Sequence, residues 1–83
     1  MPERYELLIA HRFYKDIRRI DAQNQKRILD ALRQIRQDPY QGRKVIVAET
    51  GQYRWRVGPY RIRNDIEGDK AHILRVRHRR EAY

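Results

Sequence analysis

Two spacings of hydrophobic residues divide this chain of 83 residues into a first and a second half. Near the start, Tyr5, Leu7 and Ile9 alternate with polar residues, which predicts a strand because successive side chains of a strand point to opposite faces. Helical spacing follows on two successive segments, where apolar residues lie three or four positions apart. These residues are Phe13, Ile17 and Ile20, then Ile28, Leu32 and Ile35, with Leu29 and Ala31 widening the second stripe.

The boundaries of the second helix are marked by residue type. Asp21 can accept hydrogen bonds from the free N–H groups of a first helical turn, so it is the expected N-cap. Asp38 precedes Pro39, and a residue before proline avoids the helical region, so the helix is expected to end there. The first half therefore predicts a strand followed by a helical hairpin.

The second half predicts antiparallel strands separated by short turns. The strands are expected at residues 44–49, 53–57, 60–66 and 71–77. Turns are expected at Gly58-Pro59 and at Glu67-Gly68-Asp69. The order β-α-α-β-β-β-β is typical of the α+β class, with both helices packed on one face of an antiparallel sheet. No linker or repeat interrupts the chain, so we predict a single domain over residues 1–83.

Alternation separates the strand residues into two faces. The apolar face, expected to pack on the helices, consists of Tyr53, Trp55, Val57, Tyr60, Ile62, Ile66, Leu74 and Val76. The opposite face consists of Arg54, Arg56, Arg61, Arg63, Asp65, Arg75 and Arg77. A solvated outer face is the simpler reading, because antiparallel sheets are normally polar there. However, like charges side by side on strands repel, and Asp65 is the single acid among these positions, so a bound anion explains the pattern better.

The composition indicates the same kind of partner. The net charge is +9, and sixteen of the twenty basic residues are arginine, which suits bidentate contact with phosphate or carboxylate. We expect an anionic partner: nucleic acid first, an acidic protein second and a membrane surface third. Arg18 and Arg19 are expected on the solvated back of the helical hairpin.

Several classes of protein are disfavoured. The chain has no cysteine, so it has neither a disulfide framework nor a thiolate metal site. No apolar run approaches the roughly 20 residues of a membrane span, and the charged start does not resemble a secretory signal. A cytoplasmic protein without a membrane partner is the expectation. His11, His72 and His78 are scattered, and no carboxylate pair has ligand spacing, so neither a metal nor another cofactor is expected.

Two segments of the second half carry a recognisable pattern. They are Tyr53-Arg54-Trp55-Arg56-Val57-Gly58 with Tyr60-Arg61-Ile62, and the terminal His78-Arg79-Arg80-Glu81-Ala82-Tyr83. Together with the predicted order of elements, they resemble the RelE/ParE superfamily of bacterial and archaeal toxins over essentially the whole chain. RelE-like members are ribosome-dependent endoribonucleases that cut mRNA in the decoding site. ParE-like members inhibit DNA gyrase and generally lack the terminal arginine and tyrosine group, so the resemblance implies the RelE-like branch.

The resemblance also implies partners. A toxin of a type II toxin–antitoxin system is held inactive by a cognate, RelB-like antitoxin whose acidic segment wraps the toxin surface. The ribosome and mRNA are the implied targets, and operator DNA is contacted only indirectly, through the antitoxin. Two alternatives stay open at this point: a ParE-like gyrase inhibitor without nuclease activity, and a degenerate module that only binds an antitoxin.

RNA cleavage by transesterification needs the 2′ proton removed, the phosphorane charge neutralised and the leaving 5′ oxygen protonated. Arginines suit the second task, and the resemblance implies it for Arg61 and Arg79 as catalytic residues. The expected RNA-binding residues are Arg54, Arg56, Arg63, Arg75, Arg77, Arg80 and Lys44. Arg54 and Arg56 replace lysines of the family pattern, and because arginine does not exchange protons, they are expected to serve binding.

Proton transfer is left to the terminal group. Histidine exchanges protons near neutral pH, which makes His78 a candidate. Tyr83 matches the terminal tyrosine of the family and is the second catalytic candidate for this step. The ribosome itself is a third source, so the identity of the general base stays open. Trp55 and Tyr60 are expected in the core rather than as stacking platforms, because they alternate in phase with Val57 and Ile62.

Overall fold

The computed structural model describes residues 3–45 and 51–81 and confirms the α+β class. The elements run in the predicted order along the chain. They are β1 (Glu6–Ile9), α1 (His11–Ile17), α2 (Ala22–Gln37), a short 3-10 helix η1 (Pro39–Gln41), β2 (Arg43–Lys44), β3 (Tyr53–Val57), β4 (Tyr60–Glu67) and β5 (Lys70–His78). The strand expected at residues 44–49 is represented by β2 alone, because residues 46–50 lie outside the described residues.

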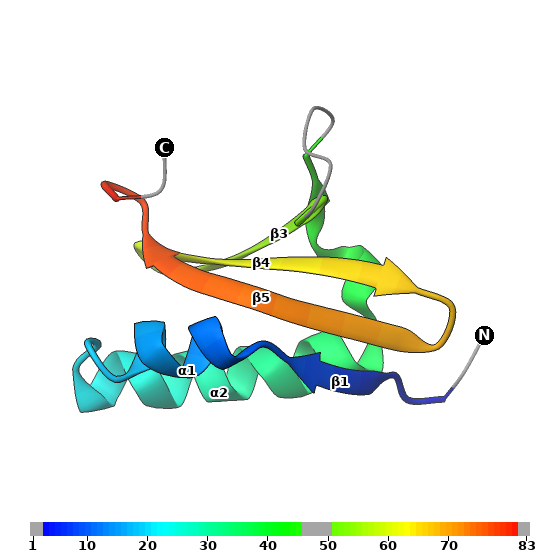
Figure 1. Ribbon diagram of the computed structural model, residues 1–83, viewed down its shortest axis with the longest axis horizontal. Coiled ribbons are helices and arrows are strands. Elements are labelled where there is room, and N and C mark those ends of the chain that lie inside the picture. Colours follow the sequence, from blue (N-terminus) through cyan, green and yellow to red (C-terminus); the bar gives the residue numbers. More distant parts are fainter. Residues whose placement is uncertain (1–2, 46–50, 82–83) are drawn as a thin grey trace.

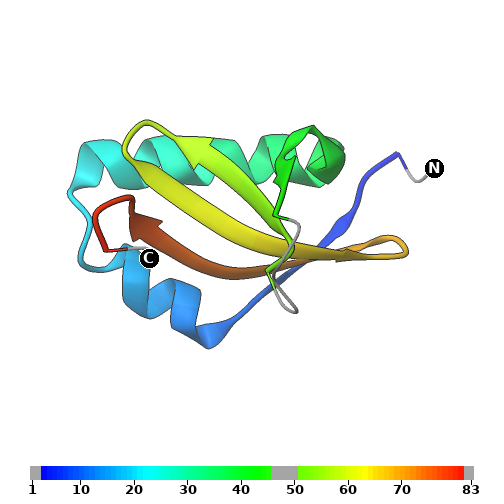
Figure 2. The same cartoon turned by 90° about the horizontal axis from the view of Figure 1, so that it is seen from above.

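The sheet has five strands in the order β1-β5-β4-β3-β2. Strands β2 to β5 are antiparallel to their neighbours as predicted, while β1 pairs in parallel with the first part of β5. Both helices lie on one side of β3, β4 and β5, and no described helix covers the other side of these strands (Figure 1). Seen from above, α2 runs along β3 and β4, whereas α1 lies beside the C-terminal end of β5 (Figure 2). One face of the sheet is thereby left for a ligand.

The second helix begins and ends where residue type predicted. The side chain of Asp21 accepts a hydrogen bond from the backbone N–H of Asn24 at 3.2 Å, and the helix stops before Asp38 and Pro39. Hydrogen bonds from Asn24 hold the pKa of the Asp21 carboxyl below its ordinary value, because they favour the ionised form. The cap therefore works best with Asp21 charged.

The core lies between the two helices and the sheet. Its fully or nearly fully buried members include Phe13, Ile20, Ile28, Ala31, Leu32, Ile35, Val57, Ile62, Ile73 and Val76. Trp55 and Tyr60 pack against this core, as predicted from their alternation. Leu29 does not belong to it, because half of its surface is exposed beside the buried stripe of α2. That part of the helical prediction is wrong.

A β-bulge changes the alternation of the last strand. Arg63 is opposite Arg75, but Asn64 is opposite Ile73, so Leu74 is an extra residue on β5. Ile73 is consequently fully buried, while Leu74 is only partly buried beside Gly51. The prediction that Leu74 joins the core is therefore wrong, since an extra residue reverses the phase of a period-two pattern.

The described helices are short and polar. None of them, over residues 3–45 and 51–81, is both long and apolar enough to cross a membrane.

Candidate functional site

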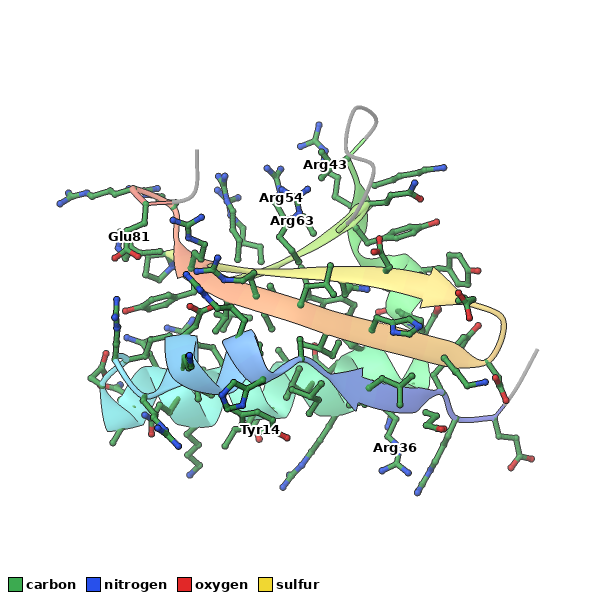
Figure 3. All side chains as sticks on the ribbon, in the orientation of Figure 1. Tyr14, Arg36, Arg43, Arg54, Arg63 and Glu81 are labelled. Atoms are coloured by element: carbon green, nitrogen blue, oxygen red, sulfur yellow. The ribbon has the colours of Figure 1, made fainter. Side chains whose placement is uncertain are left out.

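The uncovered face of the sheet carries two rows of arginines. In one row Arg43 is opposite Arg54, which is opposite Arg63; in the other Arg56 is opposite Arg61, which is opposite Arg77. Residues directly opposite each other on antiparallel strands share a face, with Cβ atoms about 5 Å apart. Arg43, Arg54 and Arg63 stand on the side of the sheet away from the helices (Figure 3). These six residues are called the arginine face below.

The clustering of positive charge on this face does not stabilise the fold. Adjacent strands are about 4.8 Å apart, so each row of three guanidinium groups starts from Cα atoms spanning only about 10 Å. Like charges directly opposite on neighbouring strands are destabilising. An extended phosphodiester chain laid along these rows would remove that repulsion and form bidentate contacts. The prediction that the strand arginines converge on one face is confirmed for Arg54, Arg56, Arg61, Arg63 and Arg77.

Arg63 and Asp65 hold the start of β3 in place. The Nε of Arg63 donates to the carbonyl of Gly51 at 2.7 Å. The carboxylate of Asp65 accepts from the backbone N–H of Gly51 at 2.9 Å and from that of Gln52 at 2.7 Å. Gly51 has φ +66°, and a Cβ there would lie 3.2 Å from Arg63 Nε, so only glycine fits well. The one acid of the predicted face thus binds backbone.

Arg75 does not stand with the arginine face as predicted. Its guanidinium turns to α1, where Nε donates to Asp16 Oδ2 at 2.7 Å and Nη2 donates to Oδ1 at 3.0 Å. Asp16 Oδ2 also accepts from the backbone N–H of Val76 at 3.2 Å, on the part of β5 that β1 does not pair with. The register places Arg75 opposite Arg63, so it is the bidentate pairing with Asp16 across the edge of β5 that draws its guanidinium away from the arginine face.

Lys44 also lies away from the arginine face. It is opposite Tyr53, whose ring packs edge-on against Tyr40 at 5.8 Å between ring centroids. Arg43, one residue earlier, takes the place expected for Lys44 because adjacent strand residues point to opposite faces.

The terminal group folds back over the end of the sheet. The backbone N–H of Arg79 donates to the carbonyl of Pro59 at 2.8 Å, which fixes Arg79 beside the β3–β4 turn. His78 is opposite Tyr60, and the two rings meet edge-on at 5.3 Å between centroids. His78 therefore faces the side of the core, on the opposite side of β5 from Arg61 and Arg77. The structure does not bring His78 together with the arginine face.

The hydrogen bonding of His78 restricts its chemistry. Its Nδ1 accepts from the backbone N–H of Arg80 at 3.1 Å, so the neutral ring carries its proton on Nε2. In that state Nε2 can donate a hydrogen bond, but the ring has no free nitrogen lone pair with which to remove a proton. Arg79 and Arg80 are exposed at the turn. Tyr83 lies outside the described residues, so its catalytic role stays a prediction.

Within residues 3–45 and 51–81, no group of three or more histidine, aspartate or glutamate side chains is placed to hold a metal ion. The arginine face is a preformed cationic surface. It can orient a polyanion and stabilise charge that develops on a phosphate.

Comparison with known proteins gives one match at the level of sequence families. A family described as the ParE toxin of type II toxin–antitoxin systems, parDE, matches residues 7–83. No individual curated protein matches the chain.

Solved toxin–antitoxin complexes share the fold. The RelB–RelE complex of Methanococcus jannaschii contains a chain 28% identical, with a TM-score of 0.76 over 92% of this chain and 94% of that one. The RelBE2 complex of Mycobacterium tuberculosis contains a chain 21% identical, with a TM-score of 0.81 over 94% of each. A ParDE complex of P. aeruginosa contains a chain 14% identical, with a TM-score of 0.75 over 93% of this chain and 98% of that one. At such identities, the latter two show likeness of fold alone.

Proposed function

This chain belongs to the ParE toxin family of type II toxin–antitoxin systems, and we propose that it acts there as a ribosome-dependent endoribonuclease. In this proposal it cleaves mRNA in the decoding site, without a metal, and its cytoplasmic activity is blocked by a cognate RelB-like antitoxin. Solved RelB–RelE and ParDE complexes both contain chains of this fold, so the choice between the two functions depends on the site.

The arginine face is the observation that carries the proposal. Three arginines in each of two adjacent rows provide a polyanion with repeated contacts along one direction. Single-stranded RNA presents a phosphate at each nucleotide, and bases need not be read for such binding. An arginine is also preorganised for bidentate contact with the equatorial oxygens of a phosphorane.

We assign charge stabilisation at the scissile phosphate to Arg61, which lies in the middle of the second row. Arg79 is anchored beside the β3–β4 turn through its backbone N–H and is proposed to supply a second cation. Arg54, Arg56, Arg63 and Arg77 hold the flanking strand, with Arg80 at the exposed turn. Arginines cannot act as the base at physiological pH, so the face itself binds and polarises RNA.

Proton transfer is assigned to the terminal group. His78 is proposed to protonate the leaving 5′ oxygen as an imidazolium, a state that requires a proton on Nδ1 and therefore loss of the hydrogen bond from Arg80 N–H. Reaching the scissile bond from the core side of β5 requires the RNA to pass around the end of that strand. Tyr83 is proposed as the second proton-transfer group, from its match to the family pattern. If no residue of the chain removes the 2′ proton, a group of the ribosome is proposed to act as the general base.

The antitoxin is proposed as the main protein partner. The solved structures that this chain resembles include RelB–RelE toxin–antitoxin complexes. A net charge of +9 favours an acidic wrapping segment over a neutral one. The ribosome and mRNA are the other proposed partners, and operator DNA is contacted through the antitoxin.

Primer extension on a defined mRNA in a translation extract tests this function. The wild-type chain should produce discrete 3′ ends on translated mRNA and none when ribosomes are omitted. Arg61→Ala should lose these products, while Arg33→Ala should keep them, because Arg33 is exposed on α2 and pairs only loosely with Asp30 at 3.7 Å. Absence of cleavage by the wild-type chain contradicts the proposal.

Inhibition of DNA gyrase is the second candidate function. The description of the matching family, a ParE toxin, favours it. A supercoiling assay with purified gyrase separates the two functions: the nuclease proposal expects no inhibition at concentrations that cleave mRNA completely. The gyrase alternative expects the reverse outcome in both assays.

A further inference from the structure

A pocket of about 210 Å³ lies where α1 meets the C-terminal half of β5. Its charged lining consists of Arg12, Asp16, Arg19, Arg75, Arg77 and Glu81. A second hollow of about 200 Å³ adjoins it and shares Arg12, Asp16, Arg19 and Arg75. Sites for drug-sized ligands are about 300–1,000 Å³, so either hollow suits a single small group rather than a nucleobase with its sugar.

The charges of this pocket favour an anion. Four guanidinium groups face two carboxylates, and one of those carboxylates, Asp16, is already bound by Arg75 through two hydrogen bonds. The backbone N–H of Arg19 donates to the carbonyl of Asp16 at 3.2 Å, but the guanidinium groups of Arg12 and Arg19 have no hydrogen bond or ion pair with the residues that the structure describes. Arg19 was expected on solvated helix surface; both Arg12 and Arg19 are exposed, and both line this pocket beside β5.

Arg77 provides an independent indication. Its Nε is fully buried, and across the described part of the chain it has no hydrogen-bond partner. Leaving a buried charged donor unpaired is costly, whereas an anion in the pocket would satisfy it. Arg77 lines the pocket and is also the end of the second row of the arginine face, opposite Arg61. The two sites are therefore continuous through one residue.

At the edge of β5 that separates the arginine face from the pocket, no described strand pairs with β5. β1 pairs with β5 only at Lys70–Ile73, so the outer edge of β5 beyond Ile73 has no β partner among the residues that the structure describes. A strand of RNA on the arginine face can turn around this edge and place its next phosphate between α1 and β5. An acidic protein segment could enter the same pocket, but continuity with the arginine face favours RNA.

We propose that Arg12, Arg19 and Arg77 form a phosphate subsite at the α1–β5 edge, which binds an RNA phosphate adjacent to the group held on the arginine face. That the anion is an RNA phosphate rests on the proposed function; the anionic character of the ligand rests on the pocket. The subsite fixes the direction of the strand on the sheet, because it exists at only one end of the second arginine row.

Binding of an eight-nucleotide, fluorescein-labelled oligouridylate, followed by anisotropy in 50–300 mM KCl, tests the subsite. Ribosomes are absent, so cleavage is not required. Arg12→Gln and Arg19→Gln should each raise the Kd about tenfold and reduce the slope of log affinity against log salt by roughly 0.7. Arg18→Gln is the matched control, because Arg18 is exposed, carries the same charge and does not line the pocket. It should change the Kd less than twofold.

Three results overturn the proposal. One is equal loss of affinity in all three variants, which indicates unspecific charge. Another is unchanged RNA binding in Arg12→Gln and Arg19→Gln. The third is unchanged RNA binding combined with weaker binding of an octaglutamate peptide, which assigns the pocket to an acidic protein segment. If the wild-type chain never cleaves mRNA but these variants lose RNA affinity as expected, the subsite stands and only the nuclease function fails.

Discussion

Replacing Asp16 by alanine is expected to destabilise the fold more than any other surface substitution in α1. The side chain of Asp16 accepts three hydrogen bonds, two from the guanidinium of Arg75 and one from the backbone N–H of Val76. They tie α1 to the outer edge of β5, where β1 no longer pairs. The pair links residues far apart in the chain, so it stabilises tertiary structure rather than a local turn.

The magnitude follows from the exposure of the two side chains. Asp16 is 13% exposed and Arg75 30% exposed, which lies between a surface ion pair, worth about 0–1 kcal/mol, and a buried one, whose disruption costs about 3–5 kcal/mol. We expect a loss of about 2–3 kcal/mol. A domain of this length has a free energy of unfolding of about 4–12 kcal/mol, and 1 kcal/mol shifts its Tm by about 4–8 °C. The Tm of Asp16→Ala should therefore fall by about 10–20 °C.

Thermal unfolding followed by circular dichroism checks this expectation. Asp16→Asn keeps an acceptor for Val76 N–H but loses the ion pair, so its Tm should lie between those of the wild type and Asp16→Ala. Asp30→Ala is the matched control, because Asp30 also lies on a helix and pairs with an arginine, but at 3.7 Å and largely exposed. It should change the Tm by no more than a few degrees. Equal Tm values for Asp16→Ala and Asp30→Ala would refute the reasoning.

Three further predictions concern the fold. Asn64 is fully buried, and neither Nδ2 nor Oδ1 of its side chain has a hydrogen-bond partner among residues 3–45 and 51–81. Because burying unpaired polar atoms is costly, Asn64→Val should raise the Tm by roughly 5–10 °C in thermal unfolding, and a lower Tm contradicts this. Gly68 has φ +59° and open space around it, so Gly68→Ala should cost about 1–2 kcal/mol in urea unfolding through backbone strain alone, and an unchanged midpoint argues against it. Hydrogen bonds from Asn24 lower the pKa of Asp21 from its ordinary value of 3.8, so the stability due to its charge is present above pH 3.8 and is lost as pH falls through the lower folded pKa. The Tm difference between wild type and Asp21→Ala should therefore shrink as the pH falls below 3.8. A Tm difference that is constant from pH 7 to pH 2 contradicts this last expectation.

Local patterns in the sequence predicted most of the sheet. Alternation assigned Arg54, Arg56, Arg61 and Arg63 to one face correctly, because β3 and β4 pair without a bulge between Tyr53 and Arg63. Asp21 was a reliable cap because its partner is three residues away. Predictions of this kind depend on neighbours in sequence, and those neighbours are visible in the chain itself.

The last strand shows where such patterns fail. The bulge opposite Arg63 depends on how two strands pair, and no residue type in β5 indicates it, so Leu74 was assigned to the wrong face. The partner of Arg75 is 59 residues away, so no local spacing could identify Asp16. Arg12 and Arg19 were missed for the same reason, because their role arises only when α1 packs beside β5.

The rate of mRNA cleavage under single-turnover conditions on programmed ribosomes tests the central claim most directly, since it measures the chemistry assigned to the arginine face. Removing one preorganised donor from a developing oxyanion costs roughly 10²–10³ in rate. Arg61→Ala should therefore cleave about 10²–10³ times more slowly than the wild type, while Arg33→Ala should cleave within about twofold of it. Equal cleavage rates for Arg61→Ala and the wild type would contradict the assignment of the arginine face as the site of phosphate stabilisation.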